Sequence, residues 1–437
     1  MNSLVGWVTA GVLLLLWPPS QVWAIPMPLE GYVPSVSMTP ADQHLQKGMA
    51  DLRINDLEAA EAAFEDTLKA DPKRVEALIG LAEIALKRGK TEETQRFLKQ
   101  ANSVAPKNLA VHLAWANFFL SRKQWHDAEV ELKKAIEIDP NALIPRLALA
   151  DFYLANLHKP KQAIVAYREA LLLDPQQVAT HYSLGAALVD DGQQNEAVRE
   201  WQEAGRLAPS NPVPFQTIGR FYSLRKEPTK AIEFFSLAIK AQPDYAPAYM
   251  DRADIYFATG EEEKALQDYH AALAIAPKSA GVYVKMGMIQ ERRQQWSAAE
   301  QALKAAVALD DKQALAYNNL AWLAAEGHIA QDSALTWANQ AVSLAPQVLE
   351  FQDTLAWVLR TRGKLEQAVS VLEKVSAKKP DESMYLYHLG VVYADMGNRK
   401  KASDAFEKAL KLNAHFPAAD DARRRLEVLK HGTSNVH

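Results

Sequence analysis

A pair of histidines one helical turn apart can hold a catalytic metal ion. The chain of 437 residues has eleven, at His44, His112, His126, His158, His181, His270, His328, His388, His415, His431 and His437. No two of them are three to five residues apart, so the helical His pair of metalloproteases is absent from the sequence. The sequence also has no glycine-rich phosphate loop, no G-x-S-x-G motif and no EF-hand calcium loop.

Neighbouring carboxylates could act as a general acid and a general base, but here they stand between predicted helices. Asp190-Asp191, Asp310-Asp311 and the run Glu261–Glu263 lie at expected turns, where acidic side chains favour the start of the next helix. The chain has no cysteines, which excludes disulfides, thiol nucleophiles, iron–sulfur clusters and cysteine-based zinc sites. We therefore expect no catalytic residues, no metal site and no cofactor, and the chain is predicted not to be an enzyme.

The bulk composition is that of a folded protein with little affinity for nucleic acid. Hydrophobic residues make up 49% of the chain and charged residues 23%, as in ordinary globular domains. The formal net charge is −4, whereas a nucleic-acid-binding surface requires a basic excess. Binding to nucleic acid is therefore not expected.

The elements that carry these residues follow a repeat of 34 residues. "LKADP" (Leu68–Pro72), "IEIDP" (Ile136–Pro140), "LLLDP" (Leu171–Pro175) and "LAIAP" (Leu273–Pro277) align at this period or its multiples, with one added residue in the fourth unit. Eleven units result, which start at Ala41, Val75, Leu109, Leu143, Val178, Pro212, Ala246, Ala280, Ala314, Leu349 and Ser383. Each unit contains two amphipathic helical patterns joined by a short polar turn.

Small residues recur at fixed positions of the units. The eighth residue is glycine or alanine in all eleven units, and the twentieth is alanine in ten, with Thr94 as the exception. Such columns are expected where two helices cross with their backbones close together, and large residues such as Trp201 and Phe235 fill the space between them. Most aromatic residues are therefore interpreted as packing residues.

These columns resemble those of the tetratricopeptide repeat (TPR) family over residues 41–416. The resemblance implies an all-α fold, an α-solenoid wound as a right-handed superhelix of about eleven helix-turn-helix repeats. Residues 417–431 are predicted to form a C-terminal capping helix, because Ala418, Ala422, Leu426 and Leu429 form an apolar stripe. Residues 432–437 are expected to be a disordered tail. The 40 residues before the repeats and the 21 after them are few for a catalytic domain, which agrees with a non-enzymatic protein.

The family implies that the second, fifth, ninth and twelfth residues of each unit face a concave groove. At these positions the chain is mostly apolar, and only Asn117 and Asn318 partly match the Lys and Asn residues of TPR domains that clamp a C-terminal carboxylate. An apolar groove suits an amphipathic helix or an extended apolar segment of a protein partner. The predicted partner-binding residues are Tyr182, Met250, Phe257, Met288, Asn318, Trp322, Trp357 and Tyr387. The alternative is that the curvature of the array, or the N-terminal linker, buries this face.

The hairpin that starts at Tyr317 carries the most pronounced pattern in the groove. Trp322 and Trp357 are the ninth residues of consecutive units, so we expect them to stand side by side and to be partly exposed in the free protein. Asn318 lies one helical turn before Trp322 on the same side. Trp337 falls on the second helix and is interpreted as packing. The fourth and ninth units each have one extra residue, within residues 154–162 and in the turn at 324–333.

The C-terminal units have a second resemblance. "NNLAWLAAEG", "DTLAWVLRTRG" and "YHLGVVYADMG" resemble the C-terminal blocks of bacterial envelope TPR proteins that accompany exopolysaccharide export and exosortase (PEP-CTERM) sorting, over residues 314–430. Some members of that group are lipoproteins, which this cysteine-free chain cannot be. The resemblance implies a scaffold of the cell envelope.

The N-terminus agrees with export. Leu4–Trp17 is an apolar run of 14 residues, short for a membrane span and suited to a signal peptide, and Val22 and Ala24 are small residues placed for cleavage before Ile25. Residues 1–24 are therefore a predicted signal peptide and residues 25–40 a proline-rich linker. "MNS" lacks the usual basic residue, so an uncleaved inner-membrane anchor or a different start site stays open.

Three functions follow from these observations. The first is a non-enzymatic periplasmic or secreted scaffold that gathers components of envelope assembly or polysaccharide export. The second is a periplasmic holdase-type chaperone that keeps unfolded clients soluble in the same groove. The third, a cytosolic TPR co-chaperone or regulator, requires that the N-terminus is not a signal.

Overall fold

The computed structural model describes residues 38–431. The predicted signal peptide, the tail at 432–437 and the linker up to residue 37 lie outside the described residues. The linker prediction ends one residue late, because the first helix begins at Pro40 rather than at Ala41. Thr39 caps this helix, its side chain exchanging hydrogen bonds with Asp42, and proline is favoured at the first helical position since it needs no amide donor there.

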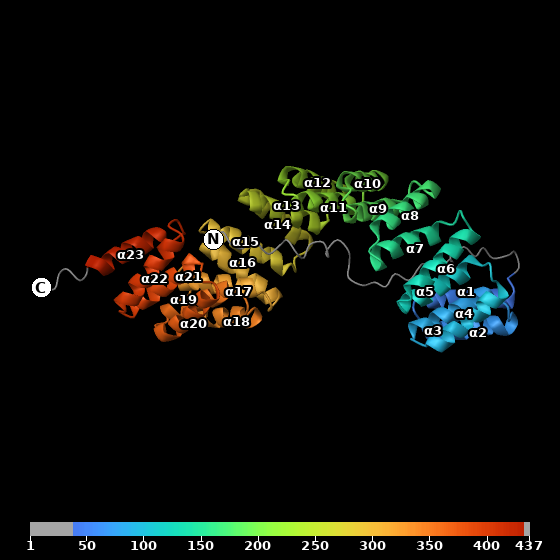
Figure 1. The fold of residues 1–437 in the computed structure, drawn as a ribbon, viewed down its shortest axis with the longest axis horizontal. Coiled ribbons are helices and arrows are strands. Elements are labelled where there is room, and N and C mark those ends of the chain that lie inside the picture. Colours follow the sequence, from blue (N-terminus) through green and yellow to red (C-terminus); the bar gives the residue numbers. More distant parts are fainter. Residues whose placement is uncertain (1–37, 432–437) are drawn as a thin grey trace. The chain divides into compact units, whose positions relative to one another are not determined.

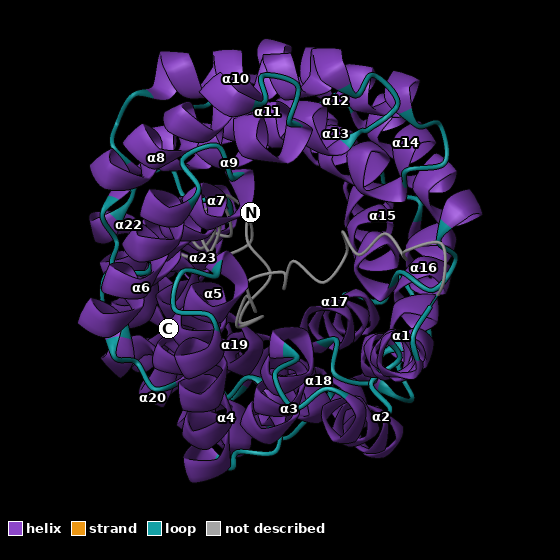
Figure 2. Cartoon of the chain, turned by 90° about the vertical axis from the view of Figure 1, so that its right-hand side faces the viewer, coloured by secondary structure: helices purple, strands orange, loops and turns teal. Residues whose placement is uncertain are grey.

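The described residues form helices, and the predicted all-α solenoid is confirmed (Figures 1 and 2). Within each of two units, successive helices pair as hairpins, and each hairpin contacts the next one along the chain. The helices fall into two compact units, residues 38–218 and residues 219–431, and the division lies within α11.

In the first unit, odd-numbered helices open each hairpin and even-numbered helices close it. The helices are α1 (Pro40–Arg53), α2 (Leu57–Ala70), α3 (Val75–Lys87), α4 (Thr91–Val104), α5 (Leu109–Ser121), α6 (Trp125–Ile138), α7 (Leu143–Asp151) with the π-helix η2 (Phe152–Asn156), α8 (Pro160–Leu173), α9 (Val178–Asp190), α10 (Gln194–Leu207) and α11 (Val213–Leu224), which the two units share.

The second unit continues the same alternation and ends in one additional helix. Its helices are α12 (Pro228–Ala241), α13 (Ala246–Thr259), α14 (Glu262–Ile275), α15 (Ala280–Arg292), α16 (Trp296–Leu309), α17 (Ala314–Ala325), α18 (Ala334–Leu344), α19 (Leu349–Thr361), α20 (Leu365–Lys378), α21 (Ser383–Asp395), α22 (Arg399–Leu412) and α23 (Ala419–His431). We call the helix that opens each hairpin the first helix and its partner the second helix.

Each hairpin turn contains one residue in the left-handed region of backbone space. These residues are Asn55, Gly89, Lys123, His158, Gly192, Lys226, Gly260, Gln294, Gly327, Gly363 and Gly397. A left-handed residue ends a helix and redirects the chain, and a residue other than glycine adopts this conformation at a cost of order 1 kcal/mol. Because five of the eleven are not glycine, the packing of the two helices imposes the turn even where the residue type disfavours it.

The small residues at the eighth position let a large side chain of the second helix reach the first helix. Trp201 of α10 is 2% exposed, and its indole nitrogen donates a hydrogen bond to the backbone oxygen of Tyr182 on α9 (3.0 Å). The ring lies directly against Gly185, where an added methyl group would clash with the indole nitrogen. Gly48, Gly219 and Gly390 face Phe64, Phe235 and Phe406 in the same way. The interpretation of these aromatic residues as packing is confirmed.

Replacement of Gly185 by alanine is expected to lower the free energy of unfolding by about 1–3 kcal/mol, because the methyl group overpacks the Trp201 ring. Gly281 is the matched control, since it also lies in a first helix and no atom is within 4 Å of its added methyl group. There, alanine should be neutral or stabilise by up to about 1 kcal/mol. Urea denaturation of both variants checks the pair, and equal effects would refute the packing argument.

The two extra residues are accommodated differently. In the fourth hairpin the extra residue lies inside the first helix, where η2 forms a single π-helical turn and the following turn keeps residues 157–159. In the ninth hairpin the turn itself is lengthened to residues 326–333. The His328 ring in that turn stacks on Trp296 with centroids 3.8 Å apart, and Arg362 donates to the backbone oxygen of Gln331.

The last helix, α23, covers the end of the array. It buries Ala419 and Ala422, and Leu426 and Leu429 pack against the same cluster as α21 and α22. The Tyr387 hydroxyl of α21 donates to the Asp421 carboxylate at 2.7 Å. The three arginines at 423–425 pair with acids on their own helix, and Arg423 and Arg424 are exposed.

Deletion of residues 417–437 is expected to unfold the array progressively from its C-terminal end. The apolar faces of α21 and α22 lose their cover, and in repeat proteins each unit is stabilised mainly by its neighbours. Amide hydrogen exchange should rise first in α21 and α22, then in α19 and α20. A uniform rise over residues 38–431 would contradict this prediction.

Candidate functional site

The eight predicted partner-binding residues all lie on first helices. Tyr182 is on α9 in the first unit, and the other seven are on α13, α15, α17, α19 and α21 in the second unit. Six are half-buried, namely Tyr182, Met250, Phe257, Met288, Asn318 and Trp322. Trp357 and Tyr387 are only 8% exposed. The half-buried residues of the second unit therefore gather on three consecutive first helices, α13, α15 and α17.

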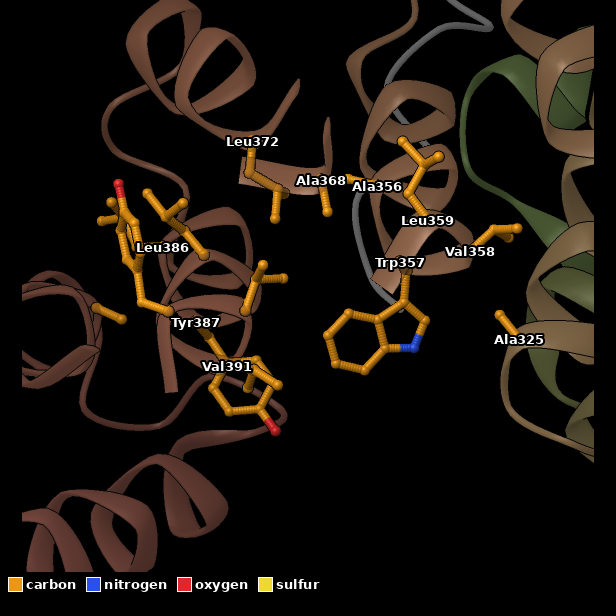
Figure 3. Packing of buried hydrophobic residues seen from close by; sticks show 14 of the residues in the cluster. Ala325, Ala356, Trp357, Val358, Leu359, Ala368, Leu372, Leu386, Tyr387 and Val391 are labelled. Atoms are coloured by element: carbon orange, nitrogen blue, oxygen red, sulfur yellow. The ribbon is translucent and has the colours of Figure 1, made fainter. Parts of the chain in front are cut away.

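The two tryptophans stand side by side as predicted, with ring centroids 6.3 Å apart and planes at 23°. The expectation that both are partly exposed is wrong for Trp357. Its indole nitrogen donates to the Glu326 carboxylate at 2.6 Å, the Arg360 guanidinium lies 4.5 Å from its ring, and the His388 ring is 4.4 Å away. Figure 3 shows this indole with its nitrogen on the side of Ala325, at the end of α17. Trp357 is consequently a core residue between hairpins.

His388 belongs to the same cluster and was not singled out from the sequence. Its Nδ1 lies 2.8 Å from both carboxylate oxygens of Asp353, and both side chains are buried. The pair joins α19 to α21, and the centroid of the His388 ring also lies 6.1 Å from that of the Trp322 ring. Because the two residues are 35 positions apart and occupy the fifth and sixth positions of their units, only an alignment of the units could have placed them together.

Such contacts recur along the second unit, and we define a polar bridge as a side-chain hydrogen bond or ion pair between consecutive first helices. Arg220 bridges α11 to Asp251 of α13 with two bonds of 2.7 and 3.3 Å. Asp254 of α13 pairs with Lys285 of α15 at 2.6 Å. Trp357 bridges α19 to Glu326 at the end of α17, His388 joins α21 to α19, and Tyr387 joins α21 to α23.

Between α15 and α17 the described residues form no polar bridge. In the pairs Arg220–Asp251 and Asp254–Lys285, the ninth residue of one unit binds the sixth residue of the next unit. The residues at these two positions of α15 and α17 are Met288 and Asn319, and neither carries a charge. We call this region, with Met288 and Glu291 on α15 and Asn318 and Trp322 on α17, the α15–α17 surface. It includes Met288, Asn318 and Trp322, three of the six half-buried residues predicted to bind a partner.

Three hydrogen-bond acceptors on α15 and α17 have no donor among the described residues, and two of them are fully buried. The buried oxygens Gln290 Oε1 and Asn318 Oδ1 accept no hydrogen bond. The Glu291 carboxylate has no ion-pair or hydrogen-bond partner among residues 38–431, and its burial raises its pKa to about 7. The nearest cation along the chain, Arg292, is already paired with Glu262 at 3.0 Å and lies 5.2 Å from the Phe257 ring.

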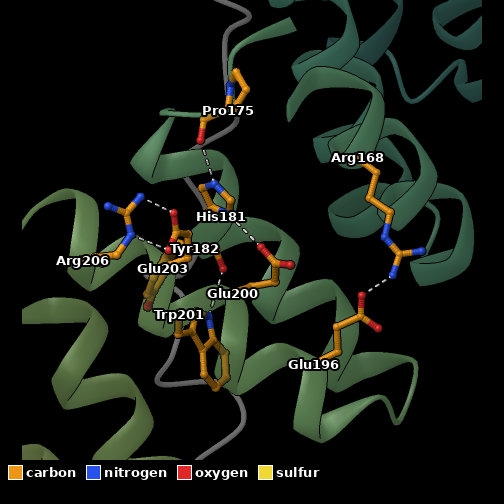
Figure 4. Close-up of polar contacts among 9 residues, drawn as sticks. All are labelled: Arg168, Pro175, His181, Tyr182, Glu196, Glu200, Trp201, Glu203 and Arg206. Carbon is orange, nitrogen blue, oxygen red and sulfur yellow. Dashed lines mark hydrogen bonds and ion pairs between the residues drawn. The ribbon is translucent and has the colours of Figure 1, made fainter. Parts of the chain in front are cut away.

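In the first unit, two histidines, His112 and His181, each join the two helices of their own hairpin and the loop that precedes it, and Figure 4 shows the contacts of His181. His181 binds the Glu200 carboxylate at 2.7 Å through Nδ1 and the backbone oxygen of Pro175 at 3.0 Å through Nε2. His112 makes the same two contacts with Glu131 and Pro106, and the hydrogen bond that the Glu131 carboxylate accepts raises the pKa of His112. These histidines have a structural role. The sequence could have shown this, because each is the fourth residue of its unit, the third unit for His112 and the fifth for His181.

Two general properties of the described chain bear on function. Within residues 38–431, no helix is long and apolar enough to cross a membrane. In the same residues, no group of three or more His, Asp or Glu side chains has the arrangement of a metal site.

Three sequence models of the tetratricopeptide repeat match the chain, at residues 52–118, at residues 284–348, and at both 246–279 and 383–416. The chain is a tetratricopeptide repeat protein. The TPR matches cover hairpins in both units and agree with the hairpin pattern of the structure. TPR arrays are in general non-catalytic and present extended surfaces to other proteins, so this TPR protein is a protein–protein interaction scaffold.

Several solved TPR-like structures are similar in fold, and no curated protein matches the chain in sequence. The APC/C hetero-tetramer Cut9-Hcn1 is 13% identical, with 89% of this chain and 97% of that chain covered and a TM-score of 0.45. A tetratricopeptide repeat protein from Parabacteroides merdae is 20% identical over 58% of this chain and 99% of that chain, with a TM-score of 0.43. YrrB, described as a TPR protein with an unusual peptide-binding site, is 21% identical over 43% and 96%, with a TM-score of 0.35.

Proposed function

We propose that this TPR protein binds apolar segments of partner proteins on the first helices of its second unit. The observation that carries the proposal is the half-buried set Met250, Phe257, Met288 and Trp322 on α13, α15 and α17. Methionine and aromatic side chains of this kind adapt to a partner and contribute most of the binding energy in many interfaces. The rest of the predicted groove contributes less, because residues such as Trp357 and Tyr387 are already buried within the protein.

The proposed location is the bacterial cell envelope, where the mature chain would be periplasmic or secreted. The support comes from the predicted signal peptide at residues 1–24 and from the likeness of residues 314–430 to envelope TPR proteins of exopolysaccharide export. N-terminal sequencing of the exported protein should give Ile25 as the first residue. Detection of an intact Met1 in the membrane fraction would favour the inner-membrane anchor instead, and a cytosolic protein would refute export.

Affinity capture from the native envelope tests the binding surface. The wild type is compared with Met288→Glu, which places a charge on the α15–α17 surface, and with Leu309→Glu as the matched control. Leu309 is an exposed residue at the end of α16, the second helix of the same hairpin. We expect one or two stoichiometric partners that Met288→Glu loses and Leu309→Glu retains when capture is carried out well below the melting temperature of each variant, because Met288 also packs against a buried cluster of α15 and α17. Equal capture by both variants would place the binding site elsewhere.

The alternative of a periplasmic holdase uses the same apolar side chains. A holdase binds many unfolded clients weakly, whereas a scaffold selects few folded or segmental partners. Suppression of aggregation of unrelated unfolded proteins by the wild type, lost in Met288→Glu, would favour the holdase.

A further inference from the structure

We infer that the segment bound by the α15–α17 surface carries a lysine or arginine whose cation pairs with the carboxylate of Glu291. The inference rests on the proposed function and specifies the chemistry of the partner. It commits to a segment with one cationic side chain flanked by apolar residues.

The first argument is the imbalance between donors and acceptors. The α15–α17 surface offers the half-buried Glu291 carboxylate, which has no donor among residues 38–431, whereas the unpaired oxygens of Gln290 and Asn318 are fully buried and out of a partner's reach. An unsatisfied polar group that a partner covers loses its remaining water and weakens binding. A partner with a cationic side chain supplies N–H donors, whereas a purely apolar segment would bury the carboxylate without compensation.

The second argument is that the cationic side chains near Glu291 are paired with other acidic residues. Lys285 is bound to Asp254, and Arg292 is bound to Glu262 and packed over Phe257. Every other pair of consecutive first helices from α11 to α21, and α21 with α23, has a polar bridge. An arginine or lysine from a partner would supply an ion pair at the single step that lacks one in this part of the described chain.

The third argument concerns the stem of the cationic side chain. Lysine and arginine bury their methylene groups on apolar surface while the charged end reaches a polar group. Met288 lies one helical turn before Glu291 on the same helix, α15, and is half-buried. Its side chain therefore offers an apolar surface for the stem beside the carboxylate.

Selection from a library of short random peptides tests the inference, since it presupposes no particular partner. The full-length wild type is used beside Glu291→Gln, which keeps the shape of the side chain and removes the charge. Glu300→Gln is the matched control, because Glu300 is an acid on α16 paired within its own helix to Lys304 at 2.7 Å. Met288→Glu reports whether selected peptides bind this surface at all.

We expect wild type and Glu300→Gln to enrich peptides with one lysine or arginine between apolar residues, and Glu291→Gln to lose that preference. Replacing the arginine of a selected peptide by neutral citrulline should weaken binding to the wild type roughly ten-fold or more and leave binding to Glu291→Gln unchanged. Enrichment of apolar peptides without a cation, sensitive to Met288→Glu, would overturn the inference and leave the proposed function intact. Peptides that ignore Met288→Glu, or no enrichment, would overturn both.

Discussion

Replacement of Trp357 by alanine is expected to lower the free energy of unfolding by roughly 3–5 kcal/mol, the range for a large aromatic residue in a packed core. The side chain is 8% exposed, and its removal leaves a cavity among α17, α19 and α21 and deprives Glu326 of its donor. Trp322 is only half-buried, so Trp322→Ala should cost less, about 1–3 kcal/mol. Chemical denaturation followed by circular dichroism measures both.

Trp357→Phe separates the two contributions. It keeps most of the apolar volume and loses the hydrogen bond to Glu326, so its cost should lie between wild type and Trp357→Ala. Trp201→Ala is the reference for a fully packed tryptophan. If Trp357→Ala were no more destabilising than Trp322→Ala, the pair would be a surface feature as the sequence alone suggested.

Replacement of Glu291 by glutamine is expected to stabilise the protein at alkaline pH and to have no effect at acidic pH. Burial raises the pKa of Glu291 to about 7, against 4.5 for the ordinary side chain. The folded state therefore holds a proton that the unfolded state releases, and stability falls as the pH rises from 4.5 to about 7. This rise in pKa makes Glu291→Gln more stable than wild type by about 3 kcal/mol of unfolding free energy at about pH 8.5. At about pH 4 the two proteins should be equally stable, because Glu291 is then protonated in both the folded and the unfolded state.

Urea denaturation of wild type and Glu291→Gln at several pH values measures this difference. Glu300→Gln, on α16, the second helix of the same hairpin, should have an unfolding free energy within about 0.5 kcal/mol of wild type at every pH, because ion pairs near the surface contribute little to stability. A stability difference between Glu291→Gln and wild type that did not change with pH would show that Glu291 ionises normally. In that case the carboxylate is well hydrated, and a cationic partner would gain little from it.

The hairpins could be predicted from the sequence because their signal is local and repeated. Nine of the eleven first helices begin at the residue where the period places a unit, from Val75 in α3 to Ser383 in α21. The pairing of glycine with a large aromatic, as in Gly185 with Trp201, follows from two columns of the same alignment. Helix geometry and steric fit within one hairpin determine both.

The candidate site could be predicted only in part, because it depends on contacts between hairpins. The ninth position of a first helix is half-buried at Trp322 and buried at Trp357, although both residues are tryptophan. The difference arises from Glu326, Arg360 and His388, which come from the preceding turn, the same helix and the following hairpin. The isolation of Glu291 was likewise hidden, since it requires knowing that Lys285 and Arg292 are engaged elsewhere.

The missing polar bridge also has a mechanical consequence. Ion pairs and hydrogen bonds have a preferred donor–acceptor distance, whereas apolar contacts tolerate sliding of one side chain over another. We therefore expect the α15–α17 step to bend more easily than the step held by the two hydrogen bonds of Arg220 to Asp251. A partner cation paired with Glu291 would add a polar contact at this step. Binding of the partner to the α15–α17 surface is therefore expected to make the helices on either side harder to bend relative to each other.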